Sequence, residues 1–216
     1  MTACPLTSDP DLNGLLAAIR ACRICREQPL SGPLPHDPRP VLQVSGTARL
    51  LLAGQAPGIR VHLSGAPFTD PSGDRLRDWL GLDKTAFYDP ARLAIIPMGF
   101  CFPGHDAKKG DLPPRRECRE AWHSQLMQAL PQVETVLAIG RYAQAWHFAR
   151  LGRALNPATA IGDIVRASVA DDGIRPRLIA LPHPSWRNSG WLNANPWFAQ
   201  EVLPLVRAEV ARLTGA

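Results

Sequence analysis

The stretch Leu50-Leu51-Leu52-Ala53-Gly54-Gln55-Ala56-Pro57-Gly58 decides the fold of this chain. Its four leading apolar residues predict a strand that is buried on both faces, the pattern typical of a parallel sheet. The two glycines that follow allow a tight turn and the close approach of another molecule. Ligands of open α/β sheets bind just past the carboxyl ends of strands, so residues 55–74 are a candidate active site. A plain strand-to-helix turn without a ligand is the alternative at this stage.

Three further apolar segments predict the remaining strands, at residues 92–97, 134–140 and 177–182. Apolar residues at helical spacing predict helices at residues 11–25, 72–82, 115–130, 141–151 and 197–213. Strands that alternate with helices indicate an α/β fold with a central, mostly parallel four-stranded sheet flanked by helices. We expect one domain over residues 1–216, with an N-terminal helix and a proline-rich connector in residues 1–47. In a doubly wound sheet, the strand ends at Gly54 and Pro182 are expected to lie side by side.

The composition suits a compact domain, because 216 residues that are 45% hydrophobic can bury a sizeable core. The net charge of +5 favours a polyanionic partner such as nucleic acid, without demonstrating one. No apolar run approaches the roughly 20 residues that span a bilayer, and the first residues do not resemble a secretion signal. We therefore expect a cytoplasmic, monomeric protein without membrane contact. Five cysteines in such a protein argue against a disulfide framework and for metal or redox chemistry.

Several segments together resemble the two signature motifs of the uracil-DNA glycosylase superfamily. They are residues 54–58, Gly65-Ala66-Pro67-Phe68, Ser72-Gly73 and His183-Pro184-Ser185. The first half is most similar to family four, the thermophile-type glycosylases, whose loop reads Gly-Glu-Ala-Pro-Gly followed by Gly-x-Pro-Phe. Residues 67–73 and 183–188 also resemble family five. The resemblance runs from about Cys22 to Asn188 and implies the three-layer α/β/α fold of that superfamily.

The activity implied by this resemblance is that of a monofunctional DNA glycosylase of base excision repair. Such an enzyme hydrolyses the N-glycosidic bond of uracil, or of a related deaminated base, after the base has been flipped out of DNA. A catalytically weak or inactive DNA-binding member of the same superfamily is the alternative. An unrelated α/β enzyme in which residues 55–58 bind a phosphate group is a third possibility.

The resemblance also implies a cofactor. Family four holds a [4Fe-4S] cluster with a Cys-x-x-Cys pair near the N-terminus, a third cysteine after the second core strand and a fourth in the next helix. Cys22, Cys25, Cys101 and Cys118 occupy those places, which leaves Cys4 as the spare. The same four ligands suit an iron-sulfur cluster or a tetrahedral zinc ion. The alternative is that these cysteines are unrelated buried thiols or a lone redox pair.

Cleavage of an N-glycosidic bond sends the base away as an anion while positive charge develops on the sugar. By resemblance, Phe68 stacks on the flipped base and His183 donates a hydrogen bond to a carbonyl oxygen of the leaving base, as an oxyanion hole does. A neutral imidazole can make that bond. The backbone amides of Gln55 and Ala56 are expected to donate to the same base, next to Gly54. Core packing of Phe68 and a capping role for His183 are the alternatives.

The residue that positions the attacking water must lie elsewhere than in the most active relatives, because they carry an aspartate where this chain has Ala56. Asp70 is the favoured substitute, since a carboxylate follows the stacking phenylalanine in the family-five-like pattern. Asp74 is the second candidate, although a carboxylate in the first turn of a helix also suits the helix dipole. His183, Asp70 and Gln55 are thus the predicted catalytic residues.

Base selection is a second departure from the resemblance. Uracil-selective relatives place an asparagine at the end of the second strand, where this chain has Pro97. Proline has no side-chain amide to read the edge of a pyrimidine. Recognition is therefore expected from backbone groups of Met98 and Gly99, or from Asn188 on the opposite loop.

Contacts to DNA should be electropositive. The candidates for binding phosphates are Lys108, Lys109, Arg115, Arg116 and Arg187. The resemblance implies that Trp186, on the loop after His183, wedges into the space that the flipped base leaves in the stack. Solvated surface charges, or salt bridges with the acidic residues at positions 106, 111 and 117, are the alternative for the basic residues before the third helix.

Overall fold

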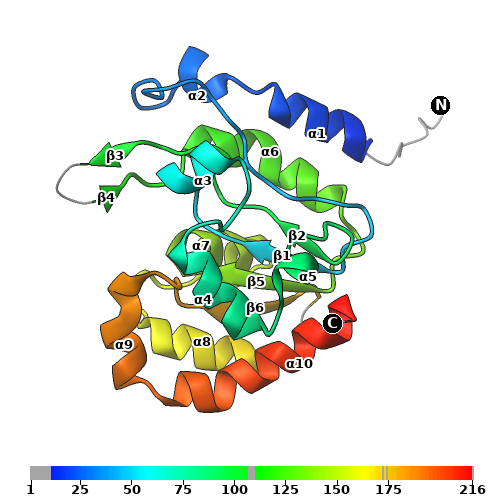
Figure 1. Ribbon diagram of the computed structural model, residues 1–216, viewed down its shortest axis with the longest axis vertical. Coiled ribbons are helices and arrows are strands. Elements are labelled where there is room, and N and C mark those ends of the chain that lie inside the picture. The colour runs from blue at the N-terminus through cyan, green and yellow to red at the C-terminus, as the bar shows by residue number, and fades with distance from the viewer. Residues whose placement is uncertain (1–10, 107–109, 172, 174, 216) are drawn as a thin grey trace.

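The computed structural model describes residues 11–106, 110–171, 173 and 175–215. Its core is one parallel sheet in the order β2-β1-β5-β6. The strands are β1 (Leu50–Ala53), β2 (Leu93–Ile95), β5 (Thr135–Ile139) and β6 (Arg177–Leu181). These are the four predicted strands, so the predicted fold class is confirmed. A separate short hairpin, β3 (His105–Asp106) with β4 (Gly110–Asp111), projects from the body beside α3 (Figure 1).

Strand β1 lies inside the sheet, which explains its uninterrupted apolar sequence. Leu50 is paired with Leu93 of β2 on one side and with Thr135 of β5 on the other. All four residues of β1 are buried, because helices cover both faces of the sheet. All strands of a parallel sheet end at the same edge, where the loops that follow them can meet.

The helices of the described residues are α1 (Leu12–Arg20), α2 (Ile24–Glu27), α3 (Ile59–Ser64), α4 (Pro71–Leu80), α5 (Lys84–Phe87), α6 (Arg116–Gln128), α7 (Gly140–Arg150), α8 (Ile161–Ala170), α9 (Ser189–Ala194) and α10 (Leu203–Thr214). In the view of Figure 1, α1 and α6 lie above the sheet, and α8 and α10 lie below it. Helix α10 packs against α4 and β1, whereas α8 packs against β6. Within the described residues, none of these helices has the length and apolarity needed to cross a membrane.

Several helices differ from the prediction, and the short helices α3, α5 and α9 were not predicted. The predicted helix over 11–25 ends at Arg20, and a separate short helix, α2, carries Cys25. The predicted helix over 197–213 begins as a π-helical turn, Phe198–Val202, because Pro204 has no N–H to donate to the preceding turn. Helix α8 was not predicted: Ile164 and Val165 bury its apolar face, but their β-branched side chains weaken the local helical preference.

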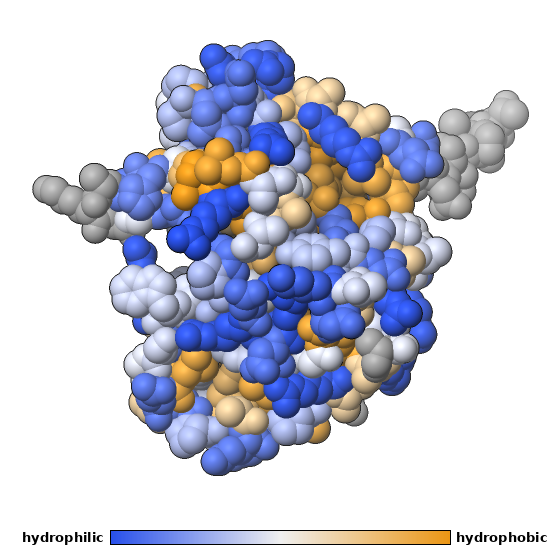
Figure 2. Space-filling model, viewed as in Figure 1, coloured by the Kyte–Doolittle hydropathy of each residue, from blue (hydrophilic) through white to orange (hydrophobic). Residues whose placement is uncertain are grey.

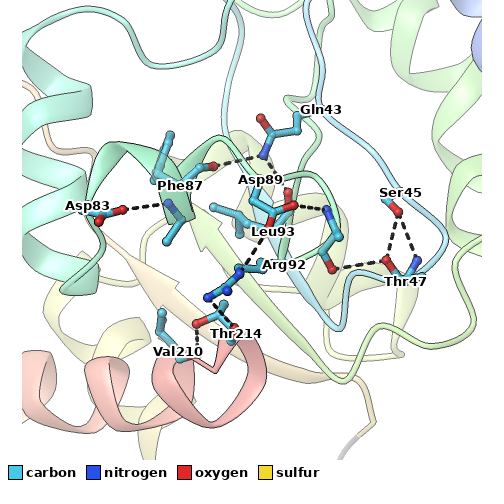
Figure 3. A network of polar contacts seen from close by, with 12 residues as sticks. Gln43, Ser45, Thr47, Asp83, Phe87, Asp89, Arg92, Leu93, Val210 and Thr214 are labelled. Atoms are coloured by element: carbon cyan, nitrogen blue, oxygen red, sulfur yellow. Dashed lines mark hydrogen bonds and ion pairs between the residues drawn. The ribbon is translucent and has the colours of Figure 1, made fainter.

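The N-terminal connector protects the edge of the sheet at β2. Gln43 forms a two-way backbone bridge with Ile95, with N···O distances of 2.7 and 2.9 Å. Its side-chain nitrogen donates to the carbonyl oxygens of Phe87 and Leu93, at 3.0 and 2.8 Å (Figure 3). The same network joins Arg92, next to β2, to the carbonyl oxygen of Thr214 at the end of α10. These bonds fix the segment that carries Phe87, which lies behind the candidate site.

Candidate active site

A cavity of about 110 Å³ opens at the carboxyl ends of β1 and β2. Its lining includes the whole turn from Gly54 to Gly58, and Phe68, Asp70, Pro97, Asp111 and His183. It is smaller than the roughly 300–1,000 Å³ of pockets for drug-sized ligands, so it suits a small, flat molecule. Phe68 and His183, which are 115 positions apart in the sequence, thus line one cavity.

The sheet order corrects one expectation. Strand β5 lies between β1 and β6, so the strand ends at Gly54 and Pro182 are not neighbours. The two loops meet across the end of β5 instead. Gly140 follows β5 with a φ of +77°, and a Cβ atom there would lie 2.5 Å from the side-chain nitrogen of Gln55. A glycine at this position therefore lets the Gln55 side chain cross toward the His183 loop.

Phe68 has a strained backbone. Its φ of +55° is the only positive value of a non-glycine residue in the described part of the chain. Its carbonyl oxygen accepts hydrogen bonds from Arg77 Nη1 and from the Tyr88 hydroxyl, at 3.1 and 3.3 Å. That oxygen also fills the place where a side chain at Gly73 would begin. Strain that the surroundings maintain in this way is typical of functional positions.

The Phe68 ring is held between the turn and the core. A Cβ atom at Gly54 would lie 3.3 Å from its Cζ atom, and the ring meets Phe87 edge to face at 6.2 Å. The guanidinium of Arg77 lies over the Phe87 ring and pairs with Asp74. Asp74 therefore anchors Arg77 and does not line the cavity, which corrects its candidacy as the water-positioning group.

The proton of His183 is placed by the backbone. The N–H of Ser185 donates to His183 Nδ1 at 3.2 Å, so Nδ1 carries a lone pair and the neutral ring carries its hydrogen on Nε2. Burial lowers the pKa of His183, while the negative charges of Asp70 and Asp111 act to raise it. The imidazole is thus neutral and can donate a hydrogen bond from Nε2. This is the form that was expected to stabilise the leaving base.

The loop that follows His183 is fixed by side chains. The Asn188 amide nitrogen donates to the His183 carbonyl oxygen at 2.7 Å. Arg75 of α4 donates to the Ser185 carbonyl oxygen at 3.1 Å and to the Ser189 hydroxyl. Asn188 was expected to read the base, and one N–H of its side-chain amide is used to hold the loop. Arg75 was not predicted, because nothing in the sequence shows that α4 faces this loop.

The N–H groups of Met98 and Gly99, two of the backbone groups expected to recognise the base, are used within the fold. Their N–H groups donate to the carbonyl oxygens of Gly54 and Gln55, at 3.0 and 2.9 Å. These donors extend the β1–β2 ladder past the strand ends and cannot also bind a base. Pro97 does line the cavity, and its carbonyl oxygen is bonded to Nε2 of the buried His123 at 3.0 Å.

Two carboxylates lie beside His183. Asp70 stands at the N-cap of α4, and its Oδ2 accepts a hydrogen bond from the Ser72 hydroxyl at 2.6 Å. Asp111 comes from strand β4, and its Oδ1 lies 3.3 Å from Nδ1 of His105. Asp111 was not predicted as a site residue, because in the sequence this carboxylate was expected only as a salt-bridge partner of nearby basic residues.

The four predicted metal ligands are free thiols that influence one another. Burial is the largest cause that raises the pKa of Cys25, to about 11, and of Cys101, to about 12. The backbone N–H of Phe100 donates to Cys118 Sγ, and the Trp122 indole donates to Cys22 Sγ, at 3.4 and 3.3 Å. No three His, Cys, Asp or Glu side chains in the described residues are arranged to hold a single metal ion.

The predicted phosphate-binding residues differ in their surroundings. Trp186 is 77% exposed, with the Arg187 guanidinium 5.9 Å from its ring centre. Arg116 is exposed and pairs with Glu120. Arg115, by contrast, is only partly exposed, pairs with Glu117 and donates to backbone carbonyls of residues 31 and 32. Arg115 therefore joins the N-terminal connector to α6; Lys108 and Lys109 lie outside the described residues.

In a comparison with protein families, residues 43–207 match the model of the Uracil DNA glycosylase superfamily. The matched region contains all four strands of the sheet, both loops of the cavity, Cys101 and Cys118. It begins after Cys22 and Cys25.

Proposed function

The chain belongs to the uracil DNA glycosylase superfamily, and on this premise we propose that it is a monofunctional DNA glycosylase of base excision repair. Its substrate is uracil or a related deaminated base, flipped out of DNA. One observation carries the proposal: a strained Phe68 and a neutral His183 with Nε2–H line the same small cavity. The described residues that line this cavity include no lysine, the nucleophile that strand cleavage through a Schiff base requires.

The base side of the reaction follows from these two residues. The flipped base stacks on the Phe68 ring, which Gly54 and Phe87 hold in place. As the bond to the sugar breaks, negative charge develops on the base, and His183 Nε2–H donates to its carbonyl oxygen. A donor fixed before the reaction stabilises that charge without reorganisation, which is the origin of oxyanion-hole catalysis. The backbone amides of Gln55 and Ala56 are proposed to donate to the same base.

On the sugar side, we propose that Asp70 orients the attacking water. Its position at the start of α4 is fixed by the bond from Ser72, and it lines the cavity beside His183. The carboxylate thereby replaces the one that more active relatives carry at the position of Ala56. The absence of an amide at Pro97 and the engaged donors of Met98 and Gly99 favour a substrate range wider than uracil alone.

The DNA is proposed to bind over Trp186, Arg187 and Arg116, together with Lys108 and Lys109. Trp186 and Ile59 of α3 line one groove beside the cavity. Figure 2 shows apolar residues exposed over α3, where Leu63 is 68% exposed. An exposed indole beside exposed apolar side chains is suited to enter the base stack when a nucleotide leaves it.

For the cofactor, we propose that Cys22, Cys25, Cys101 and Cys118 hold a [4Fe-4S] cluster, with zinc as the alternative. Four mutually interacting thiols, two of which receive N–H hydrogen bonds, fit the donor set and the hydrogen bonding of such clusters. The bound group would supply structural cross-linking, since its ligands come from α2 and the turn before it, from the segment after β2, and from α6. Iron, sulfide and zinc determination on the purified protein distinguishes the two metals.

The activity is tested with oligonucleotides that carry a single uracil, hypoxanthine or xanthine. We expect release of the base and an abasic strand that breaks only after alkali. Ala56 and Pro97 favour the second candidate, an inactive DNA-binding member of the superfamily. That candidate predicts binding to the same oligonucleotides with no abasic product from any of them.

A further inference from the structure

Asp111, the last residue of β4, lies at the mouth of the cavity that Phe68 and His183 line. It lines the cavity of about 110 Å³ and also the two grooves next to it, one toward Arg187 and one toward Arg60 and Arg75. The residues that share all three linings with Asp111 include Asp70 and Ser72. Asp111 therefore stands where the three hollows meet, on the route by which a nucleotide would enter.

The carboxylate of Asp111 lies against the turn after β1. A Cβ atom at Gly58 would be 3.2 Å from Asp111 Oδ2. A side chain at Gly58 would thus crowd the oxygen that faces this turn. The other oxygen, Oδ1, is 3.3 Å from Nδ1 of the exposed His105 on the neighbouring strand. His105 and Asp111 are opposite each other in the β3–β4 pair.

Four charged or titratable groups surround this carboxylate. His105 lies beside it on β3, and Asp70 faces it from the start of α4. His183 is close enough for the charge of Asp111 to raise its pKa, against the effect of burial. The Arg187 guanidinium lies over Gly110, the residue before Asp111. Of these four groups, only the Arg187 guanidinium carries a permanent positive charge, and the contact of Asp111 with His105 is exposed and is not a buried ion pair.

We propose that Asp111 is a catalytic residue of the base-excision reaction, an inference that rests on the proposed function. The C1′–N bond breaks and its electron pair leaves with the base, whose oxygen is bonded to His183 Nε2–H. The oxygen of a water molecule forms the new bond to C1′, and its proton passes to the Asp111 carboxylate, which later releases it to solvent. The same negative charge faces the positive charge that develops on the sugar.

Asp111 suits the proton-accepting role better than Asp70. One oxygen of Asp70 already accepts a short hydrogen bond from Ser72, and its backbone caps α4. Asp111 has only a long contact to an exposed histidine on Oδ1, while Oδ2 points toward the turn. Asp70 then orients the water, and Asp111 takes its proton. Together, the two carboxylates would take the place of the single aspartate that more active relatives carry at the position of Ala56.

The test compares single-turnover excision by wild type, Asp111→Asn and Asp106→Asn on the best deaminated substrate. Asp106 lies across the same hairpin but lines none of the three hollows, so its variant removes the same charge without touching the site. We expect Asp111→Asn to lose about 10²-fold or more in rate, the usual contribution of a general base. Binding to the oligonucleotide and the melting temperature should change little, and Asp111→Glu should recover part of the rate.

The outcomes separate this inference from the proposed function. If wild type forms no abasic product, the glycosylase proposal itself fails. If wild type is active and Asp111→Asn keeps its full rate, only the role of Asp111 is overturned. An equal loss in Asp106→Asn, or a loss explained by weaker DNA binding alone, also overturns it, because either would show that the hairpin charge acts on binding.

Discussion

At the scale of single residues, one backbone hydrogen bond decides what His183 can do. The Ser185 N–H occupies Nδ1, so the only hydrogen of the neutral ring is on Nε2. Burial keeps the ring neutral by lowering its pKa. The residue types His-Pro-Ser were visible in the sequence, but the direction of the proton was not.

Replacement of His183 by alanine removes the donor to the leaving base. We expect the single-turnover rate to fall by about 10²–10³-fold, or roughly 3–4 kcal/mol of transition-state stabilisation, as in other oxyanion holes. The affinity for an oligonucleotide should remain close to that of wild type, since the bond strengthens only as charge develops. Full activity in this variant would refute the assigned role.

The buried histidines predict a pH dependence of stability. Burial lowers the pKa of His123 to about 4 and of His147 to about 3, from an ordinary value of 6.5. The folded state therefore binds fewer protons than the unfolded state below pH 6.5, and stability falls as the pH is lowered from about 6.5 to about 4.

Each of these histidines should add roughly 1.4 kcal/mol per pH unit to the decrease in the free energy of unfolding. Urea unfolding between pH 7 and pH 4.5 measures the slope. The variant His147→Leu lacks one titrating group and should show a shallower slope. An unchanged slope in that variant would mean that His147 is not neutral in the fold.

At the scale of elements, α4 connects the two halves of the site. It begins at Asp70, provides the glycine that accommodates the Phe68 carbonyl, and sends Arg75 to the His183 loop and Arg77 to Phe68. Its helical spacing was predictable from the apolar residues on its buried face. Its contacts with the His183 loop were not, because they join residues about 110 positions apart.

Substitution of Gly73 by alanine tests this element. The added methyl group would overlap the Phe68 carbonyl oxygen, so either α4 or Phe68 must move. We expect a loss of unfolding free energy of about 3 kcal/mol or more and a loss of excision. Gly190→Ala in α9 is the matched control, since a Cβ atom there meets nothing within 4 Å. That control should be neutral or slightly stabilising in thermal and chemical unfolding.

At the scale of the whole molecule, the four cysteines lie on segments that the chain brings together from far apart. Cys22 and Cys25 precede the matched family region, Cys101 follows β2, and Cys118 is in α6. Arg115 adds a second link between the N-terminal connector and α6. A bound cluster would tie the same parts of the molecule.

The variant Cys101→Ser should lose metal and unfold at a lower temperature, by about 5 °C or more, because a structural metal contributes folding free energy directly. Cys4→Ser is the matched control, as the sequence leaves Cys4 outside the proposed ligand set. Its metal content and melting temperature should equal those of wild type. A Cys101→Ser protein with undiminished iron and an unchanged melting temperature would exclude this ligand.

The sequence by itself determined the strands of the sheet and the two loops of the site, because short apolar runs and glycine-rich turns act locally. Phe68, His183 and the four cysteines were predicted from their resemblance to a family. Only the tertiary structure decided that β5 separates β1 from β6, that Arg115 pairs with Glu117, and that the N–H groups of Met98 and Gly99 donate within the fold. It alone brought Asp111 to the cavity. Such features depend on contacts between distant segments, and local sequence patterns do not encode which distant segment supplies a partner.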